Sequence, residues 1–328
     1  MRKLLVIAVD QQRLGAAPGP HTFKPTHEEL LRAVSGDTFE VVVATPEEAK
    51  EHYADAEIIA TFPLRAPDIS LLPKAKWLHS FSAGVDRILT PAVAASDIHL
   101  TNSSGVHATP IAEHIMATLL IFTRSFHKTF QRQQKHEWEK DQSLSELRGK
   151  NILIVGLGEI GKETARLAHA FGAHVHAVSR SGADKPEFVE RLEKSDQLDA
   201  MLPSADFVVI TLPYTEETHH LFDKNKFALI KPSAIIINIG RGGIIKEADL
   251  IDALKKKIIA GAGLDVFEKE PLPAESELWD MEQVIITPHH SGLSHKYMDR
   301  AIEWLCKNLE AYLNGQVLPS EVDKKLGY

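Results

Sequence analysis

The feature that most constrains this chain is a glycine-rich turn between an apolar run and a helical segment. The run NILIV at 151–155 leads into GLGEIG at 156–161, and the helix-like stretch KETARLAHAFG follows. In a G-x-G-x-x-G turn the first glycine allows the tight bend, the second lets a pyrophosphate approach the backbone, and the third lets helix and strand pack closely. The helix N-terminus adds N–H groups for the phosphates. We therefore predict a dinucleotide site with contacts from Gly156, Gly158, Glu159, Ile160 and Gly161.

Short apolar runs alternate with helical segments along most of the 328 residues. The runs lie at 4–9, 39–44, 57–60, 77–81, 151–155, 174–178, 206–212, 235–239, 260–266 and 284–287. Strands that alternate with helices form parallel sheets. We predict an α/β fold of two doubly wound parallel-sheet domains, in which a Rossmann cofactor domain is inserted into a flavodoxin-like substrate domain. The cofactor domain is expected at 104–293, and the substrate domain at 1–103 and 294–328, because a C-terminal helix at 294–314 is expected to return to it.

A single long helix is expected at about 109–130. Thr109 is a suitable N-cap with Pro110 at the first helical position, and apolar residues then recur at helical spacing on one face. A polar stretch that contains Trp138 follows.

The residues at the end of the strand that follows the glycine-rich turn determine which dinucleotide is preferred. In NAD-binding domains an acidic residue there accepts a hydrogen bond from the ribose 2′-hydroxyl. This chain has Ser179-Arg180-Ser181 instead. An arginine and two hydroxyls are suited to a 2′-phosphate, so we expect NADP(H) to be preferred, with NAD(H) as the second choice.

Three reactive side chains follow the last three apolar runs. Arg241 follows the run at 235–239, Glu270 the run at 260–266, and His289 the run at 284–287. The carboxyl ends of parallel strands meet at one edge of a sheet, where ligands bind. An arginine fork can hold a substrate carboxylate and polarise a ketone. A histidine can protonate the nascent alkoxide, and a neighbouring carboxylate orients its ring and favours its charged form.

The chain resembles the D-isomer-specific 2-hydroxyacid dehydrogenase family over nearly its whole length. The stretches that carry the resemblance are SAGVD 82–86, AEHIMATLL 112–120, GLGEIG 156–161, LPYTEETHHLF 212–222, INIGRGGIIKEADLIDAL 237–254, GLDVFEKEPLP 263–273 and TPHHSG 287–292. The family's catalytic arginine, glutamate and histidine fall on Arg241, Glu270 and His289. Its substrate-carboxylate loop falls on SAGVD, where the N–H groups of Ala83 and Gly84 are expected to bind substrate together with Arg241 and His289.

The resemblance also implies the rest of the cofactor site. Asp265 is expected to contact the nicotinamide amide, and the cofactor is expected to be lined by Thr109, Leu212, Pro213, Thr218, Ile239 and Gly292. One departure is His290, where relatives usually carry an aliphatic residue. The resemblance favours a homodimer, to which the long helix and the Trp138 segment offer surface.

The composition of the chain limits the partners, the location and the metal sites that can be expected. With 37 Lys+Arg against 45 Asp+Glu the net charge is −8, which argues against a nucleic-acid partner. The N-terminal apolar run ends at Asp10, too short for an export signal or a membrane span. One cysteine, Cys306, favours a cytoplasmic protein. The 17 histidines show no recognised metal spacing, so no metal site is expected.

The leading hypothesis is an NADPH-dependent reductase that converts small 2-oxo acids, such as glyoxylate or hydroxypyruvate, to D-2-hydroxy acids. A phosphite or formate dehydrogenase of the same superfamily is the alternative enzyme. The formate branch carries glutamine where this chain has Glu270, which counts against formate. A dinucleotide-sensing binding module is the alternative outside enzymes. The loops near 62–67 and 82–86 determine which substrate side chain is accepted, and the sequence alone does not identify that side chain.

Overall fold

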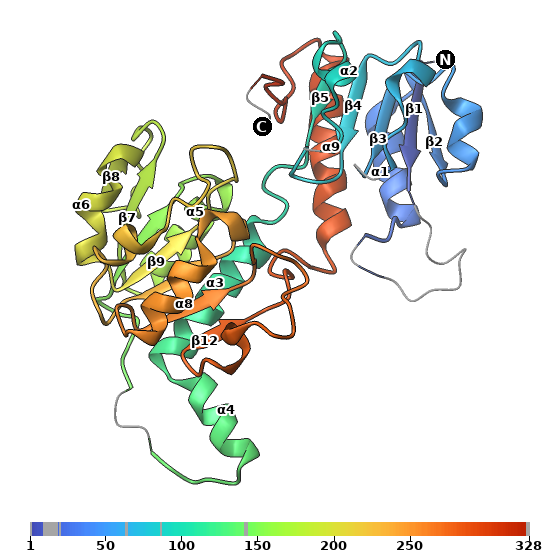
Figure 1. Ribbon diagram of the computed structural model, residues 1–328. Helices are drawn as coiled ribbons and strands as arrows, with labels where there is room; N and C mark the ends of the chain where they lie inside the picture. The colour runs from blue at the N-terminus through green and yellow to red at the C-terminus, as the bar shows by residue number, and fades with distance from the viewer. Residues whose placement is uncertain are drawn as a thin grey trace. The chain divides into compact units, whose positions relative to one another are not determined.

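The structure, a computed structural model, describes residues 2–8, 19, 21–62, 65–85, 87–140 and 144–325. The chain divides into two compact units, which we call unit 1 (Met1–His107 with Leu293–Tyr328) and unit 2 (Ala108–Gly292). Each unit is built on a parallel sheet flanked by helices (Figure 1), which confirms the predicted fold class.

Unit 1 has a five-stranded sheet in the order β2-β1-β3-β4-β5, which is the flavodoxin-like order. Its strands are β1 (Arg2–Ile7), β2 (Phe39–Ala44), β3 (Ile58–Thr61), β4 (Trp77–Ser80) and β5 (His99–Thr101). Its α-helices are α1 (Pro25–Ser35), α2 (Pro91–Ala94) and α9 (Tyr297–Leu313). The helix α9 belongs to unit 1 although the whole of unit 2 separates it from the other elements along the chain.

The sheet of unit 1 is buried on both faces. Successive side chains of a strand point to opposite faces, and β1 therefore contributes to two apolar clusters. Leu4 and Val6 pack with residues of α1 and α9 in one cluster. Leu5 and Ile7 pack on the other face, with residues that include Val93 of α2. Burial on both faces explains why these strands are continuous apolar runs.

Unit 2 has a seven-stranded sheet in the order β12-β11-β10-β9-β6-β7-β8. Its strands are β6 (Asn151–Val155), β7 (His174–Ser179), β8 (Arg191–Lys194), β9 (Phe207–Ile210), β10 (Ile235–Asn238), β11 (Gly261–Leu264) and β12 (Val284–Ile286). Its α-helices are α3 (Ala108–Thr123), α4 (Phe126–Gln134), α5 (Glu159–Ala170), α6 (Leu198–Met201), α7 (Lys224–Phe227) and α8 (Glu247–Lys255). The order reverses between β6 and β9, as in a Rossmann fold, and such a reversal marks the ligand-binding crevice.

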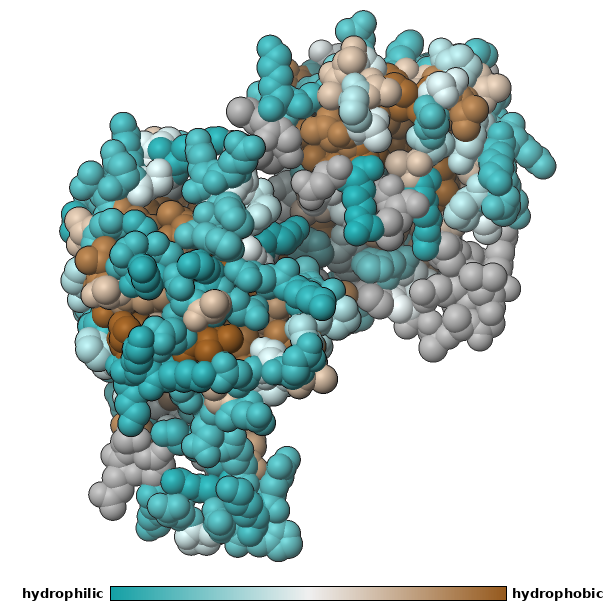
Figure 2. All heavy atoms as spheres, in the orientation of Figure 1, coloured by the Kyte–Doolittle hydropathy of each residue, from teal (hydrophilic) through white to brown (hydrophobic). Residues whose placement is uncertain are grey.

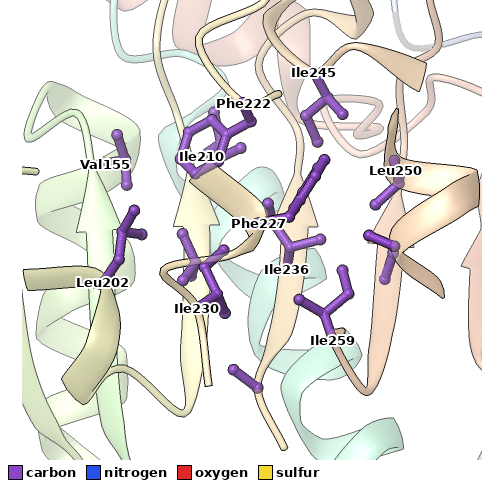
Figure 3. Close-up of a cluster of buried hydrophobic side chains, with 14 of the residues drawn as sticks. Val155, Leu202, Ile210, Phe222, Phe227, Ile230, Ile236, Ile245, Leu250 and Ile259 are labelled. Carbon is purple, nitrogen blue, oxygen red and sulfur yellow. The ribbon is translucent and has the colours of Figure 1, made fainter. Parts of the chain in front are cut away.

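Two apolar layers cover the sheet of unit 2. On one face Val155, Ile210 and Ile236 pack against residues that include Phe227 of α7 and Leu250 of α8 (Figure 3). On the other face, residues of β6, β7, β9 and β10 pack against α3 and α5. The sheet is thereby held rigidly between helices, and the turns at its carboxyl edge are supported from both sides.

The predicted helix at 109–130 is wrong in two respects. It is two helices, because Ser125 adopts a left-handed conformation (φ 51°) that separates α3 from α4. It begins at Ala108, so Thr109 lies in the first turn of α3 and is not its N-cap. The helix α4 extends away from the sheet of its unit (Figure 1).

Two short strands were not predicted. The strand β5 has three residues, and β8 reads Arg-Leu-Glu-Lys, which has no apolar run. Both are edge strands, where one side of the strand needs no sheet partner and polar residues are tolerated. The C-terminal helix is present as α9, and Gly315 follows it closely.

Hydrophilic side chains cover most of the visible face of unit 2 (Figure 2). Within the described ranges, no helix combines the length and the apolar character needed to cross a bilayer.

Candidate active site

The glycine-rich turn has the geometry that a bound pyrophosphate requires. Gly156 follows β6 with a φ of 103°, and α5 begins at Glu159, directly after Gly158. A Cβ on Gly161 would lie 2.2 Å from the Gly156 carbonyl oxygen, so a side chain there would separate helix from strand. A Cβ on Gly158 would meet nothing within 4 Å, so this glycine leaves open space in front of the helix N-terminus. The residues present therefore fit a dinucleotide.

Other expected cofactor residues surround this turn. The hydroxyl of Thr211 donates to the Gly156 carbonyl (2.5 Å), which ties the end of β9 to the turn. The neighbouring Leu212 contacts Gly156, and the Thr218 hydroxyl donates to the Pro213 carbonyl (2.8 Å) and so closes the loop after β9. Ile239 is buried in the layer beneath the sheet, to which Ile160 also contributes.

Thr109 and Glu159 line one cavity of about 240 Å³ between the start of α3 and the exposed side of α5. The other lining residues are Ala108, Lys162, Glu163, Arg166 and Phe188. This cavity is separate from the catalytic side chains predicted from the sequence, and its charged groups are largely paired with each other, as Arg166 is with Glu163 (2.6 Å).

The turn after β7 contains Ser179, Arg180 and Ser181. The Ser179 Oγ accepts a hydrogen bond from the Gly182 N–H (3.0 Å), and the Ser181 Oγ accepts one from the Ala183 N–H (3.2 Å). Each serine hydroxyl therefore retains its own proton to donate. The side chain of Arg180 is exposed at this turn.

Glu270 and His289 form a hydrogen-bonded pair. The His289 Nδ1 lies 2.7 Å from the Glu270 Oε2, and because an ionised carboxylate only accepts, Nδ1 carries the proton. The Phe267 N–H donates to the other carboxylate oxygen (3.0 Å), so the orientation of Glu270 is fixed at both oxygens. The Nε2 atom is then the nitrogen that can exchange a proton with a ligand.

Arg241 lies on a turn that the end of β10 organises. The Asn238 side chain accepts from the Gly240 N–H (3.0 Å) and donates to the Arg241 carbonyl (3.0 Å). The Arg241 Nη1 donates to the Gly240 carbonyl (2.8 Å). A Cβ on Gly242 would lie 2.0 Å from the Phe267 carbonyl oxygen, so this turn packs directly on the segment that leads to Glu270.

Asp265 organises the loop that carries His289. Its carboxylate is 1% exposed and accepts from the Thr287 hydroxyl (2.6 Å) and from the backbone N–H groups of His290 (3.1 Å) and Ser291 (3.0 Å). The Thr287 hydroxyl also lies 3.2 Å from the His114 Nε2, a partner that the sequence did not indicate. His289 itself has a left-handed backbone (φ 50°), and Gly292 is the last residue of unit 2.

The loop after β4 in unit 1 carries Ala83 and Gly84. Side chains or backbone from other segments hold its carbonyl groups: Tyr297 Oη donates to Phe81 (2.6 Å), Ser103 N–H to Ser82 (3.2 Å) and Asn102 Nδ2 to Ala83 (2.8 Å). The N–H groups of Ala83 and Gly84 donate to no residue within the described part of the chain. These two N–H groups are therefore available to a ligand.

Buried neutral side chains support this loop. Burial raises the pKa of Tyr297 to about 12, so its hydroxyl remains a donor to Phe81. Burial lowers the pKa of His79 to about 3, and its neutral ring is bonded to the Thr101 hydroxyl (2.7 Å). Asn102 and Tyr297 are functional candidates that the sequence did not single out, because only the folded chain brings them to the loop. Residues 63, 64 and 86 of the expected specificity loops lie outside the described residues.

Comparison with known proteins finds sequences and structures that are similar to this chain. A family model described as "D-isomer specific 2-hydroxyacid dehydrogenase, NAD binding domain" matches residues 116–291. The chain is 36% identical over 280 residues to a glyoxylate/hydroxypyruvate reductase B of Escherichia fergusonii, which covers 83% of this chain and 86% of that protein.

Solved structures match over the full length. A D-isomer specific 2-hydroxyacid dehydrogenase family protein from Aeromonas salmonicida has a TM-score of 0.82 and 34% identity, covering 98% of this chain and 99% of that one. An NADPH-dependent glyoxylate/hydroxypyruvate reductase from Sinorhizobium meliloti, in complex with NADP and sulfate, has a TM-score of 0.80 and 30% identity and covers 100% of both chains.

Proposed function

We propose that this chain uses NADPH to reduce small 2-oxo acids to D-2-hydroxy acids. The chain belongs to the D-isomer specific 2-hydroxyacid dehydrogenase family, and it is therefore an oxidoreductase that binds a nicotinamide dinucleotide. Glyoxylate and hydroxypyruvate are the proposed substrates, and the printed names of the relatives support this class. The observation that carries the proposal is the hydrogen-bonded pair of His289 and Glu270, at 2.7 Å.

The pair is suited to protonate an alkoxide. Glu270 holds Nδ1, so the ring presents Nε2 toward a ligand. When bound, the dihydronicotinamide supplies the hydride for the carbonyl carbon of the 2-oxo acid. His289 then delivers the Nε2 proton to the developing alkoxide oxygen, and the uptake of a proton from solvent restores the ring.

Two groups are proposed to hold the substrate carboxylate. The Arg241 guanidinium spends one N–H on the Gly240 carbonyl and has further donors for a carboxylate and a ketone oxygen. The Ala83 and Gly84 N–H groups form the second set, supported by the arrangement of the carbonyl groups around them. We accordingly propose unit 1 as the substrate domain and unit 2 as the cofactor domain, with Asp265 contacting the nicotinamide amide.

NADP(H) is the proposed cofactor, with NAD(H) as a weaker second. The turn of Ser179, Arg180 and Ser181 offers donors and a positive charge where NAD-binding domains carry a carboxylate. The remaining proposed cofactor contacts are Thr109, Gly156, Gly158, Glu159, Ile160, Gly161, Leu212, Pro213, Thr218, Ile239 and Gly292.

The test is the absorbance of the nicotinamide band with NADPH and with NADH against glyoxylate, hydroxypyruvate, pyruvate, bulkier 2-oxo acids and phosphite. We expect fastest consumption of NADPH with glyoxylate or hydroxypyruvate, and chiral analysis of the hydroxypyruvate product should give the D-isomer. Reduction of NADP⁺ by phosphite without any turnover of 2-oxo acids would instead establish the phosphite dehydrogenase alternative.

A homodimer is proposed as the assembly. Phe126 and Phe130 of α4 are exposed and stack on each other at 5.8 Å, and Trp138 is 96% exposed. Exposed aromatic side chains of this kind are typical of protein interfaces. Light scattering at micromolar concentration is expected to report twice the chain mass, and a monomer would contradict the proposal.

A cytoplasmic location is proposed on the chain's single cysteine, Cys306. Cell fractionation with an antibody to the full chain is expected to recover it with cytoplasmic markers.

A further inference from the structure

The edge strand β8 brings a lysine to the turn that follows β7. The strands β7 and β8 are parallel, and Ser179 is the register partner of Lys194. Both residues are the last of their strands. Because parallel strands end at the same edge of a sheet, Lys194 leaves the sheet beside the turn of Ser179, Arg180 and Ser181.

The side chain of Lys194 lies across this turn. Gly182 has a φ of 64°, and a Cβ on it would lie 2.9 Å from the Lys194 Cγ and 3.1 Å from the Lys194 backbone nitrogen. The position thus excludes a side chain by conformation and by space together. The aliphatic stem of Lys194 packs on the turn, and its ammonium lies at the end of a flexible stem that starts there.

Lys194 has no electrostatic partner within the described part of the chain. The nearby carboxylates of the same segment are engaged elsewhere: Glu193 accepts from Arg191 (3.0 Å) and Glu190 is paired with His174 (2.7 Å). By contrast, the ammonium of Lys185 donates to the Val189 carbonyl (2.7 Å). Lys194 is therefore a cation available to a ligand at this turn.

We propose that Lys194 is a second cationic contact for the phosphate on the 2′ position of the adenosine ribose. This inference rests on the proposed use of NADPH. A phosphate monoester carries nearly two negative charges at neutral pH and three acceptor oxygens. Arg180 supplies a planar guanidinium and Lys194 a second positive charge. The hydroxyls of Ser179 and Ser181 supply neutral donors. Both negative charges of the phosphate are thereby neutralised by cations from two neighbouring strand ends.

The experiment compares two ligands that differ only in this phosphate, adenosine 2′,5′-bisphosphate and adenosine 5′-monophosphate. Calorimetric titration of the full chain gives the affinity of each ligand for wild type and Lys194→Gln. We expect Lys194→Gln to weaken the bisphosphate by about fivefold, the effect of one lost exposed charge contact, and to change the monophosphate by less than about twofold. The difference in bisphosphate affinity between wild type and Lys194→Gln should decrease as the salt concentration is raised.

Lys257→Gln is the matched control. Lys257 is an exposed lysine between α8 and β11, far from β8 in the strand order, and it forms no ion pair within the described part of the chain, so this variant removes an equal charge away from the turn. It should leave both affinities nearly unchanged, whereas Lys194→Arg should retain most of the bisphosphate affinity.

The outcomes separate this inference from the cofactor choice on which it rests. If wild type binds the bisphosphate much more tightly than the monophosphate, and Lys194→Gln keeps that difference, Lys194 has no such role and the NADPH proposal stands. If Lys194→Gln and Lys257→Gln weaken the binding of the bisphosphate equally, the effect is one of overall charge and the inference is wrong. If wild type does not distinguish the ligands, the proposed preference for NADPH is itself wrong.

Discussion

The two ends of the sheet in unit 2 present functional side chains in different ways. At the β10–β12 end, Glu270 is held at both carboxylate oxygens, and the loop of His289 is fastened to the buried Asp265. At the β7–β8 end, Arg180 is exposed on the turn after β7, and Lys194 is the exposed last residue of β8. The first end is fixed by a network of hydrogen bonds, two of which run from the backbone of the His289 loop to the buried Asp265, and the second depends on charges in contact with water.

The difference follows from what each end is proposed to do. Proton transfer requires reacting atoms within hydrogen-bond reach, and small displacements are costly. Recognition of a phosphate charge tolerates flexible cations, because the attraction varies slowly with distance. Substitutions at the β10–β12 end should therefore affect turnover and stability, whereas those at the β7–β8 end should affect cofactor selectivity alone.

The largest effect is expected from His289→Asn. The variant removes the proton donor but no proposed contact to the dinucleotide, so kcat should fall by about 10²- to 10⁴-fold while the Kd of NADPH stays within about twofold. Steady-state kinetics with glyoxylate and fluorescence titration of NADPH measure the two quantities. Turnover near the wild-type value would remove His289 from the mechanism.

Asp265→Ala should show that the β10–β12 end also supports the fold. The Thr287 hydroxyl and the N–H groups of His290 and Ser291 lose their acceptor. Buried donors without partners cost about 1–3 kcal/mol each, so we expect a Tm lower by roughly 6 °C or more. Asp196→Ala, which removes an exposed carboxylate just after β8, is the control and should leave the Tm nearly unchanged. Equal Tm values for the two variants would contradict the proposed difference in structural importance between the two ends of the sheet.

Arg180→Asp should change selectivity without changing stability. The new carboxylate repels a 2′-phosphate and can accept from a 2′-hydroxyl. The ratio of kcat/KM for NADPH to that for NADH should fall at least about tenfold, or 1.4 kcal/mol, with an unchanged Tm. An unaltered ratio would show that Arg180 does not contribute to the selection between NADPH and NADH.

The smallest effect is expected from Glu270→Gln. An amide oxygen can still accept from the Nδ1 proton and orient the ring of His289, but it does not form the charge-assisted bond of a carboxylate. In steady-state kinetics kcat should therefore fall only about threefold, while the Kd of NADPH stays within about twofold. A loss as large as that of His289→Asn, or no loss at all, would contradict the role of Glu270 in orienting the ring.

The sequence predicts the interior of the fold better than its edges. Central strands are buried on both faces and must be apolar, so runs such as NILIV at 151–155 identify them. The edge strand β8 carries three charged residues among its four and gives no such signal. The break between α3 and α4 escapes prediction because Ser125 is not a residue that typically adopts a left-handed conformation, and the apolar spacing continues through Phe126 and Phe130.

The same distinction applies to the site. GLGEIG and the residues that follow the last three strands are visible in sequence, because each function depends on a local motif or a strand end. Asn102, His114, Lys194 and Tyr297 are not visible in this way, because each lies against a residue that is distant along the chain or in another strand. For Lys194 the missing information was the existence of β8 itself.

The return of α9 to unit 1 has a consequence for synthesis of the chain. Tyr297 reaches Phe81 across 216 positions of sequence, and Ser320 bonds the Asn102 carbonyl across 218. A growing chain therefore has every residue of unit 2 before it has the helix that completes unit 1. Because domains fold as units during translation, unit 2 is the first that can close its core, and the loop of Ala83 and Gly84 gains its contact from Tyr297 last.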